Sequence, residues 1–394
     1  MISFVHSALL VLALSPASEA PPLERDRSTL EQNTFSFELR DGQLSGPGAE
    51  RLREAAAAAT MFCVGESHGN VQTPTLLRAL LPDLAKAGYG AYAIETGERI
   101  ANHAESAIQR GLKETLPTLV RMPYTAPFID RQSEFALLRA AVSQRLDVWG
   151  LDQVFLGGAR FNLSELVRLA PTPEARALAE SSMQRAIEGF LHFAKTRDQS
   201  KGFLAATTPE QYQALRDAFQ GSSEGLRIID ELEKSARVYG LYGAGKNYES
   251  NFERIELMKR HLNENLRQLP VEKKVLLKFG SVHMGRGYSP LNQLDLGNAA
   301  AELAAHRGGS SFHLLVTAAQ FSSGPSPYAE LVEALGDNDW AFIDLRPLRE
   351  HFHKDSSPIE PGSFRQLVWR YDAVAITKRF AEDPHLSGIP TLPR

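Results

Sequence analysis

Four residues whose side chains can transfer protons stand just after short apolar segments of the sequence. They are Glu66, His68, Glu95 and His283. Two imidazoles and two carboxylates in one cleft can act as general acids and bases, or can bind a metal ion. We therefore predict a site of hydrolytic type from these residues, on condition that the fold brings them together.

The elements that position them are predicted from the apolar runs. Seven runs have the length and the β-branched or aromatic content of buried strands, and helical patterns lie between them. They cover residues 60–64, 90–94, 147–151, 274–279, 311–316, 340–345 and 373–376. This alternation predicts an α/β fold, with a mostly parallel open sheet and flanking helices. Ligands bind beyond the carboxyl ends of such strands, so we expect the four residues to meet there.

The stretch from residue 159 to 269 has a different pattern. It lacks a convincing strand, and Thr172-Pro173 and Thr208-Pro209 are typical helix starts. We predict that 49–158 and 270–380 form the α/β core and that 159–269 is a helical cap inserted between its halves. A separate helical domain is the alternative. Residues 21–48 are predicted to be a leader segment that wraps around the core.

The first twenty residues have the pattern of a signal peptide. The apolar run from Ala8 to Leu14 is followed by small residues, with Ser18 and Ala20 at the positions that precede cleavage. The run is too short to span a bilayer. We therefore expect export to the periplasm or the medium. The single cysteine, Cys63, excludes an internal disulfide, and its apolar neighbours indicate a packed core thiol.

Composition narrows the class of partner. Of the 394 residues, 43% are hydrophobic, and the formal net charge is −4. The chain can therefore bury a full core, and no basic surplus favours nucleic acid. We expect a small-molecule or peptide substrate and no membrane span. The sequence does not indicate an oligomeric state.

Taken singly, each candidate has an ordinary structural explanation. A glutamate after a strand often caps a helix, Asp152 after the run 148–151 could do the same, and a histidine in a glycine-rich loop is often a surface residue. The coincidence of several such residues at strand ends favours the functional interpretation.

The motifs at these strand ends resemble those of the erythromycin esterase family. The resemblance rests on Gly65-Glu66-Ser67-His68-Gly69, Ala93-Ile94-Glu95, Gly150-Leu151-Asp152 and the His283 loop. Arg254 and Met258 match an Arg-x-x-x-Met helix, 295–298 matches an Asn-Leu-Gly segment, and 371–374 matches a closing Phe-Asp-Ala strand. The similarity runs in order from about residue 59 to 378. The wider superfamily includes ChaN-like haem-binding proteins and TIKI-type metalloproteases.

Two departures separate this chain from the esterases. Gly-Glu-Ser-His-Gly is one residue shorter than the Gly-Glu-x-Thr-His-Gly of the esterases and is closer to the ChaN-like pattern. Gly280-Ser281 stands where the esterases tend to have His-Asn. The resemblance therefore extends to the general site and not to macrolide specificity.

The resemblance implies roles for the site residues in cleaving an ester, lactone or amide bond. His68 would deprotonate water, because imidazole titrates near neutral pH, and Glu66 or Glu95 would orient it. His283 would stabilise the oxyanion or protonate the leaving group. The residues expected to bind substrate or to support the site are Arg254, Asp152, Ser281 and Arg286.

Two alternatives use the same residues differently. As ligands, Glu66, His68, Glu95 and His283 could hold a divalent metal, as in a TIKI-like metal-dependent hydrolase or protease. A ChaN-like protein would instead bind haem or iron without hydrolytic turnover, through a Tyr or His axial ligand in a flat apolar cleft.

Overall fold

A computed structural model describes residues 24–112, 116–321, 324–353 and 358–387. The strands are β1 (Thr34–Arg40), β2 (Gln43–Ser45), β3 (Met61–Glu66), β4 (Tyr89–Gly97), β5 (Asp147–Asp152), β6 (Lys274–Gly280), β7 (Ser311–Phe321), β8 (Gly324–Pro325), β9 (Trp340–Asp344) and β10 (Ala373–Arg379). They form one ten-stranded sheet in the order β2-β1-β9-β10-β7-β3-β6-β4-β5, with β8 paired to β7. The predicted mostly parallel, open α/β sheet is confirmed.

The parallel part of the sheet runs from β10 to β5. All seven predicted strands are present. The prediction missed β1, β2 and the two-residue β8. β1 pairs antiparallel with β9 near the edge and buries only Phe37 of its seven residues, so its apolar residues alternate with polar ones and form no continuous apolar run. The predicted leader therefore adds strands to the sheet, besides the helix α1 (Glu24–Gln32).

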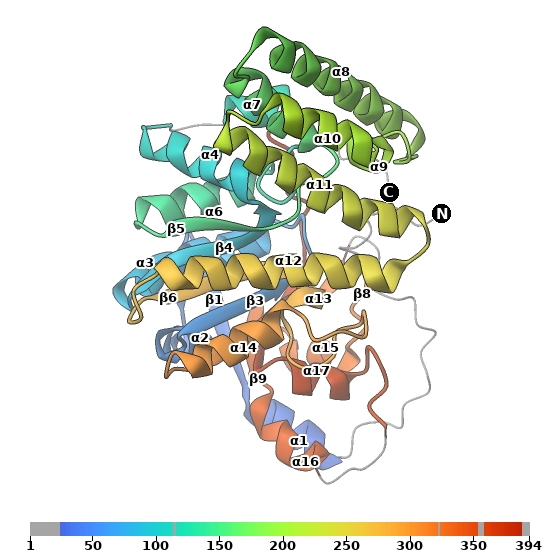
Figure 1. The fold of residues 1–394 in the computed structure, drawn as a ribbon. Helices are drawn as coiled ribbons and strands as arrows, with labels where there is room; N and C mark the ends of the chain where they lie inside the picture. The colour runs from blue at the N-terminus through green and yellow to red at the C-terminus, as the bar shows by residue number, and fades with distance from the viewer. Residues whose placement is uncertain (1–23, 113–115, 322–323, 354–357, 388–394) are drawn as a thin grey trace.

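Helices cover both faces of the sheet (Figure 1). On the first face lie α2 (Pro47–Ala58), α3 (Gln72–Lys86), α4 (Glu98–Gln109), α5 (Pro117–Arg121) and α6 (Gln132–Ser143). On the second lie α12 (Asn247–Gln268), α13 (Ser281–Met284), α14 (Leu296–His306), α15 (Ala329–Leu335) and α17 (Phe364–Arg370). Within β3, Phe62 and Val64 pack on the first face, and Met61 and Cys63 pack on the second. This alternation decides the face to which each site residue points.

Further helices form a layer beyond β5, as Figure 1 shows in green. They are α7 (Ala159–Leu169), α8 (Pro173–Thr196), α9 (Phe203–Ala206), α10 (Pro209–Ala218) and α11 (Ser223–Gly243), and they share a hydrophobic core of their own. Thr172 and Thr208 cap α8 and α10 through their side chains. The last helix of the interval, α12, packs instead against β5 of the sheet.

The remaining elements lie outside the site. A short 3-10 helix, Arg346–Leu348, leads into α16 (Arg349–Phe352) near α1. No helix in the described part of the chain is long and apolar enough to cross a membrane. The predicted signal peptide, residues 1–20, lies outside the described residues.

Candidate active site

The site lies where four adjacent parallel strands end. The order β3-β6-β4-β5 places the carboxyl ends of these strands side by side, although they come from distant parts of the sequence. Their ends bring together Glu66 on β3, Glu95 on β4, Asp152 on β5 and His283 on α13, which follows β6. All are at least 95% buried. Of the four residues predicted to meet, Glu66, Glu95 and His283 therefore lie together at this edge.

His68 joins the two carboxylates across the sheet edge. Its Nδ1 lies 2.9 Å from Glu66 Oε1, and its Nε2 lies 3.1 Å from Glu95 Oε2. Glu66 continues the alternation of Phe62 and Val64 and points to the first face, whereas Glu95 continues that of Ala91 and Ala93 and points to the second. The imidazole therefore spans the end of the intervening strand β6.

Gly280, the last residue of β6, makes room for the imidazole. A Cβ atom at this position would lie 2.8 Å from His68 Nε2, which is closer than real Cβ contacts. The Gly280 N–H also donates to Glu95 Oε2 at 2.7 Å. The backbone at Gly280, with φ −54° and ψ 144°, is one that any residue can adopt. Glycine is therefore needed here for the close approach of His68 and not for its conformational freedom.

Gly280→Ala is therefore expected to displace His68 while leaving the strand intact. We expect kcat/KM on a turned-over substrate to fall about 100-fold, because a misplacement of about 1 Å can cost this much. The matched control is Gly240→Ala in α11, where an added Cβ meets nothing within 4 Å. Full activity in a folded Gly280→Ala protein would contradict the assigned geometry.

A buried arginine connects Glu95 to the neighbouring strand. Arg254, on α12, donates to Glu95 Oε1 at 2.7 Å, and it holds Asp152 with Nε at 3.0 Å and Nη2 at 2.5 Å. Its side chain is 3% exposed. Asp152 is thus a partner of Arg254 and does not touch His68 directly.

His283 is oriented by a residue that the sequence prediction did not assign. Asp295 caps α14 through Leu296 N, and its carboxylate also lies 3.0 Å from His283 Nδ1. The other ring nitrogen, Nε2, faces Arg254 Nη1 at 3.2 Å and Glu95 Oε1 at 3.7 Å. The N-cap position of Asp295, just before an Ala-rich helix, was the available sequence signal.

The charges of the cluster hold His68 in its protonated form. Burial alone would lower the pKa of His68, but Glu95 and Glu66 raise it to about 9. Burial alone would raise the pKa of Glu95, but His68, His283 and Arg254 hold it well below its ordinary value. The expectation that His68 titrates near neutral pH is therefore wrong, because two carboxylates contact its ring.

A lysine within the apolar strand β6 was also missed. Lys278 is 4% exposed, and its Nζ donates to Glu66 Oε1 and, at 2.7 Å, to Glu134 Oε1 on α6. A charge inside the run Val-Leu-Leu-Lys-Phe-Gly is a usable signal, since lysine is almost never buried without a partner.

Two of the predicted supporting residues lie apart from the cluster. Arg286 binds Asp372 through both terminal nitrogens, and one of them also reaches Ser311. Arg286 therefore links the loop after His283 to Ser311 on β7 and to Asp372, which precedes β10. Ser281 begins α13, and its backbone carbonyl accepts a hydrogen bond from Tyr371.

Two phenylalanines cover the cluster. The Phe128 ring stacks on the His68 imidazole with centroids 3.7 Å apart, and Phe155 meets Phe128 edge-on at 5.9 Å. Phe128 has a φ of +75°, which a bulky residue rarely adopts. The His68 side chain is 6% exposed beneath this cover. The Phe128 ring thus lies against the His68 imidazole, which is largely shielded from solvent.

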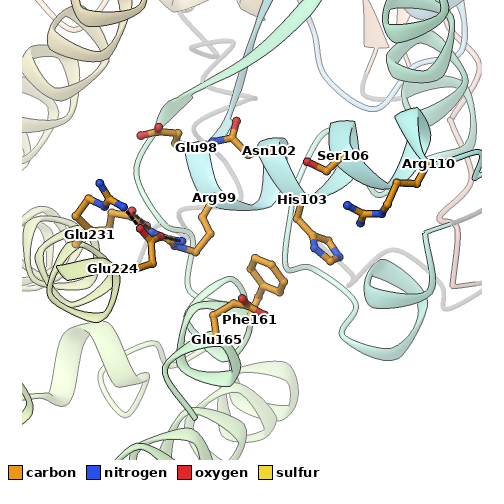
Figure 2. Close-up of a pocket in the computed structure, with 11 residues that line it drawn as sticks. Glu98, Arg99, Asn102, His103, Ser106, Arg110, Phe161, Glu165, Glu224 and Glu231 are labelled. Atoms are coloured by element: carbon orange, nitrogen blue, oxygen red, sulfur yellow. Dashed lines mark hydrogen bonds and ion pairs between the residues drawn. The ribbon is translucent and has the colours of Figure 1, made fainter. Parts of the chain in front are cut away.

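A separate pocket of about 480 Å³ lies between α4 of the core and the helices α7 and α11 (Figure 2). Arg99 crosses it from α4 and forms ion pairs with Glu224 and Glu231 of α11. Phe161 and His103 form an aromatic part of its wall. None of its lining residues belongs to the cluster around His68. The pocket thus lies between α4 and the helices α7 and α11 and is separate from the cluster around His68.

The cluster does not fit a metal ion. Both ring nitrogens of His68 contact carboxylates, and the buried cations Arg254 and Lys278 supply the compensating charge. Among the described residues, no three histidine, cysteine, aspartate or glutamate side chains are arranged to hold a metal. For haem, the tyrosines Tyr89, Tyr92 and Tyr239 are buried among core residues, whereas Tyr288 is 65% exposed.

The comparisons with known proteins show the fold. The sequence matches no protein-family model and no curated protein. Among solved structures, a mutant of the erythromycin esterase EreC in its open conformation has a TM-score of 0.61 at 13% identity, over 90% of this chain and 100% of that one. A Bacillus cereus protein has a TM-score of 0.60 at 12% identity, over 91% and 98%.

Two further structures complete the comparison. A succinoglycan biosynthesis protein has a TM-score of 0.60 at 14% identity, over 94% of this chain and 100% of that one. ChaN of Campylobacter jejuni, with haem bound cofacially, reaches only 0.36 at 10% identity, over 88% and 97%. The chain therefore has the erythromycin esterase-like fold, and the likeness to ChaN carries no argument.

Proposed function

We propose that this protein is a hydrolase that activates water to cleave an ester, lactone or amide bond. The observation that carries the proposal is the His68 imidazole, held between two buried carboxylates at the carboxyl edge of a parallel sheet. A carboxylate on one ring nitrogen fixes a histidine for proton transfer at the other. Here Glu66 holds Nδ1, so Nε2 is the atom that exchanges protons.

The mechanism follows from the contacts of Nε2. In the resting site this nitrogen faces Glu95, so His68 must first lose its proton, and a water molecule must take a place beside Nε2. The neutral imidazole then accepts a proton from this water as its oxygen attacks the substrate carbonyl. We assign Arg254, which Glu95 and Asp152 hold in place, the role of stabilising the negative charge that develops on the carbonyl oxygen.

His283 is the proposed acid for the leaving group. Burial and the Arg254 guanidinium, whose Nη1 lies 3.2 Å from Nε2, act to lower its pKa, but Asp295 beside Nδ1 and Glu95 near Nε2 raise it above its ordinary value. A guanidinium only donates hydrogen bonds, so Nε2 carries the proton to be transferred once Arg254 Nη1 has turned from it to the substrate oxygen. The protonated His283 then gives this proton to the departing oxygen or nitrogen when the carbonyl intermediate collapses. His68, between Glu66 and Glu95, is thus the proposed base, and His283, between Asp295 and Glu95, is the proposed acid.

The test is a hydrolysis screen with the purified full chain. Aryl esters, alkyl esters, lactones, amides and a macrolide are incubated at pH 7 and pH 9, with and without a chelator. Acid release from the esters and lactones is followed by pH-stat, and amide cleavage by chromatographic detection of the released amine. We expect saturable release from at least one class that survives chelation. Absence of release from every class would refute the proposal. Activity that requires a divalent cation would favour the metal-dependent alternative.

A further inference from the structure

Lys278 stands in a position where a strand normally carries an apolar residue. Its neighbours Leu276 and Leu277 are fully buried, and the Lys278 side chain is 3% exposed. Leu276 packs on the first face of the sheet, so Lys278 points to the same face as Glu66. A buried ammonium is costly unless it is paired, and here Glu66 and Glu134 are its partners.

Glu134 is itself fixed at the start of α6. Its backbone N–H and that of Ser133 donate to the carboxylate of Asp383, which comes from the C-terminal part of the chain. The Glu134 side chain therefore projects from an anchored helix start toward β6. Its Oε1 accepts the hydrogen bond from Lys278 Nζ.

Glu134, Lys278 and Glu66 form a chain of contacts that leads to His68. Glu66 Oε1 accepts from Lys278 Nζ and also contacts His68 Nδ1. The other carboxylate oxygen, Oε2, is buried and has no hydrogen-bond partner among the described residues. Lys278 is therefore the only anchor of this carboxylate, among the described contacts, apart from His68 itself.

We propose that Lys278, held by Glu134, is a positioning residue that keeps the Glu66 carboxylate ionised and aimed at His68 Nδ1. The proposal rests on the function of His68 as the base. Lys278 makes no hydrogen bond to His68 among the described contacts, so it acts on the imidazole through Glu66 and through its own positive charge.

Lys278 and Glu134 are expected to change the proton affinity of His68 in opposite directions. Removing the positive charge of Lys278 raises the pKa of His68, because a cation nearby disfavours the imidazolium. Removing the negative charge of Glu134 lowers it for the converse reason. The other charged or titratable groups that face His68 or Glu66 stay in place; they are Glu95 and Tyr92 on β4, Arg254 on α12 and His283 on α13.

The experiment is an NMR titration of His68 in the full chain labelled with ¹³C,¹⁵N-histidine, from pH 6 to pH 10.5. The His68→Asn variant identifies its signal. Lys278→Met and Glu134→Gln are compared with the wild type, and Glu134→Gln retains a carbonyl oxygen for Lys278. The control is Lys274→Met on the same strand, whose ammonium lies near the Tyr89 ring, outside the site.

We expect the midpoint to move up by about one pH unit in Lys278→Met and down in Glu134→Gln, with no change in Lys274→Met. On a turned-over substrate, kcat should fall at least about tenfold in Lys278→Met at pH 7, with KM little changed.

Should Lys278→Met fail to fold, the downward movement of the His68 midpoint in Glu134→Gln decides alone. Unmoved midpoints overturn the inference, even where turnover is found. Absence of turnover with moved midpoints overturns only the proposed hydrolase.

Discussion

Replacing His68 by asparagine is expected to lower kcat/KM on any substrate of this protein by about 10²–10⁴-fold, the range over which general bases contribute. The asparagine amide can still donate to Glu66 from near the position of Nδ1, but nothing remains at the position of Nε2. The substitution therefore removes the proton acceptor and keeps the neighbouring hydrogen bond. The loss should appear in kcat, because His68 makes no proposed contact with the distant parts of a substrate.

Steady-state kinetics and thermal unfolding together check this expectation. The control is His192→Asn in the cap, since His192 is paired with Asp198 and lies far from the cluster in sequence. It should behave as the wild type. A folded His68→Asn protein that retains kcat/KM within about threefold would remove His68 from the mechanism, because the loss of a base costs far more.

Replacing Arg254 by methionine is expected to damage both stability and activity. The side chain is almost fully buried and compensates Glu95 and Asp152 at once. Breaking a buried ion pair from one side costs about 3–5 kcal/mol, because the remaining charge stays without compensation. Activity should also fall, since Arg254 contacts both Glu95 and His283 of the proposed site.

The free energy of unfolding, measured with urea, checks the first part of this prediction. The matched control is Arg237→Met, because Arg237 pairs with Glu253 at the surface with 69% of its side chain exposed. Such a pair contributes about 0–1 kcal/mol. If Arg254→Met and Arg237→Met lower the free energy of unfolding by the same amount, the buried network around Arg254 is not what stabilises this part of the molecule.

The sequence was sufficient to predict where the candidate residues would meet. Buried parallel strands have continuous apolar runs, so the ends of β3, β4, β5 and β6 were visible, and the polar residues after them could be placed at one edge. The strand order was not visible. It is this order that puts β6 between β3 and β4, and it explains why Gly280 is required.

Other features depended on contacts that no local pattern reveals. The pairing of Lys278 with Glu134 joins residues 144 positions apart, and that of Arg254 with Glu95 joins residues 159 positions apart. The high pKa of His68 follows from two carboxylates that approach from opposite faces. The sequence alone could not show that Arg286 lies outside the cluster, because its partner Asp372 comes from a distant part of the chain.

The pH dependence of kcat/KM in the wild-type protein tests the proposed role of His68 most directly. The pKa of His68 is raised to about 9, so the imidazolium predominates at neutral pH and the neutral base forms only as the pH rises toward that value. We predict that kcat/KM increases above pH 6 as neutral His68 forms and falls again at the alkaline end, where His283, the proposed acid, loses its proton. A decrease from pH 6 onward would make the His68 imidazolium the active form, and a flat profile would exclude His68 from proton transfer; either result would contradict its function as the base.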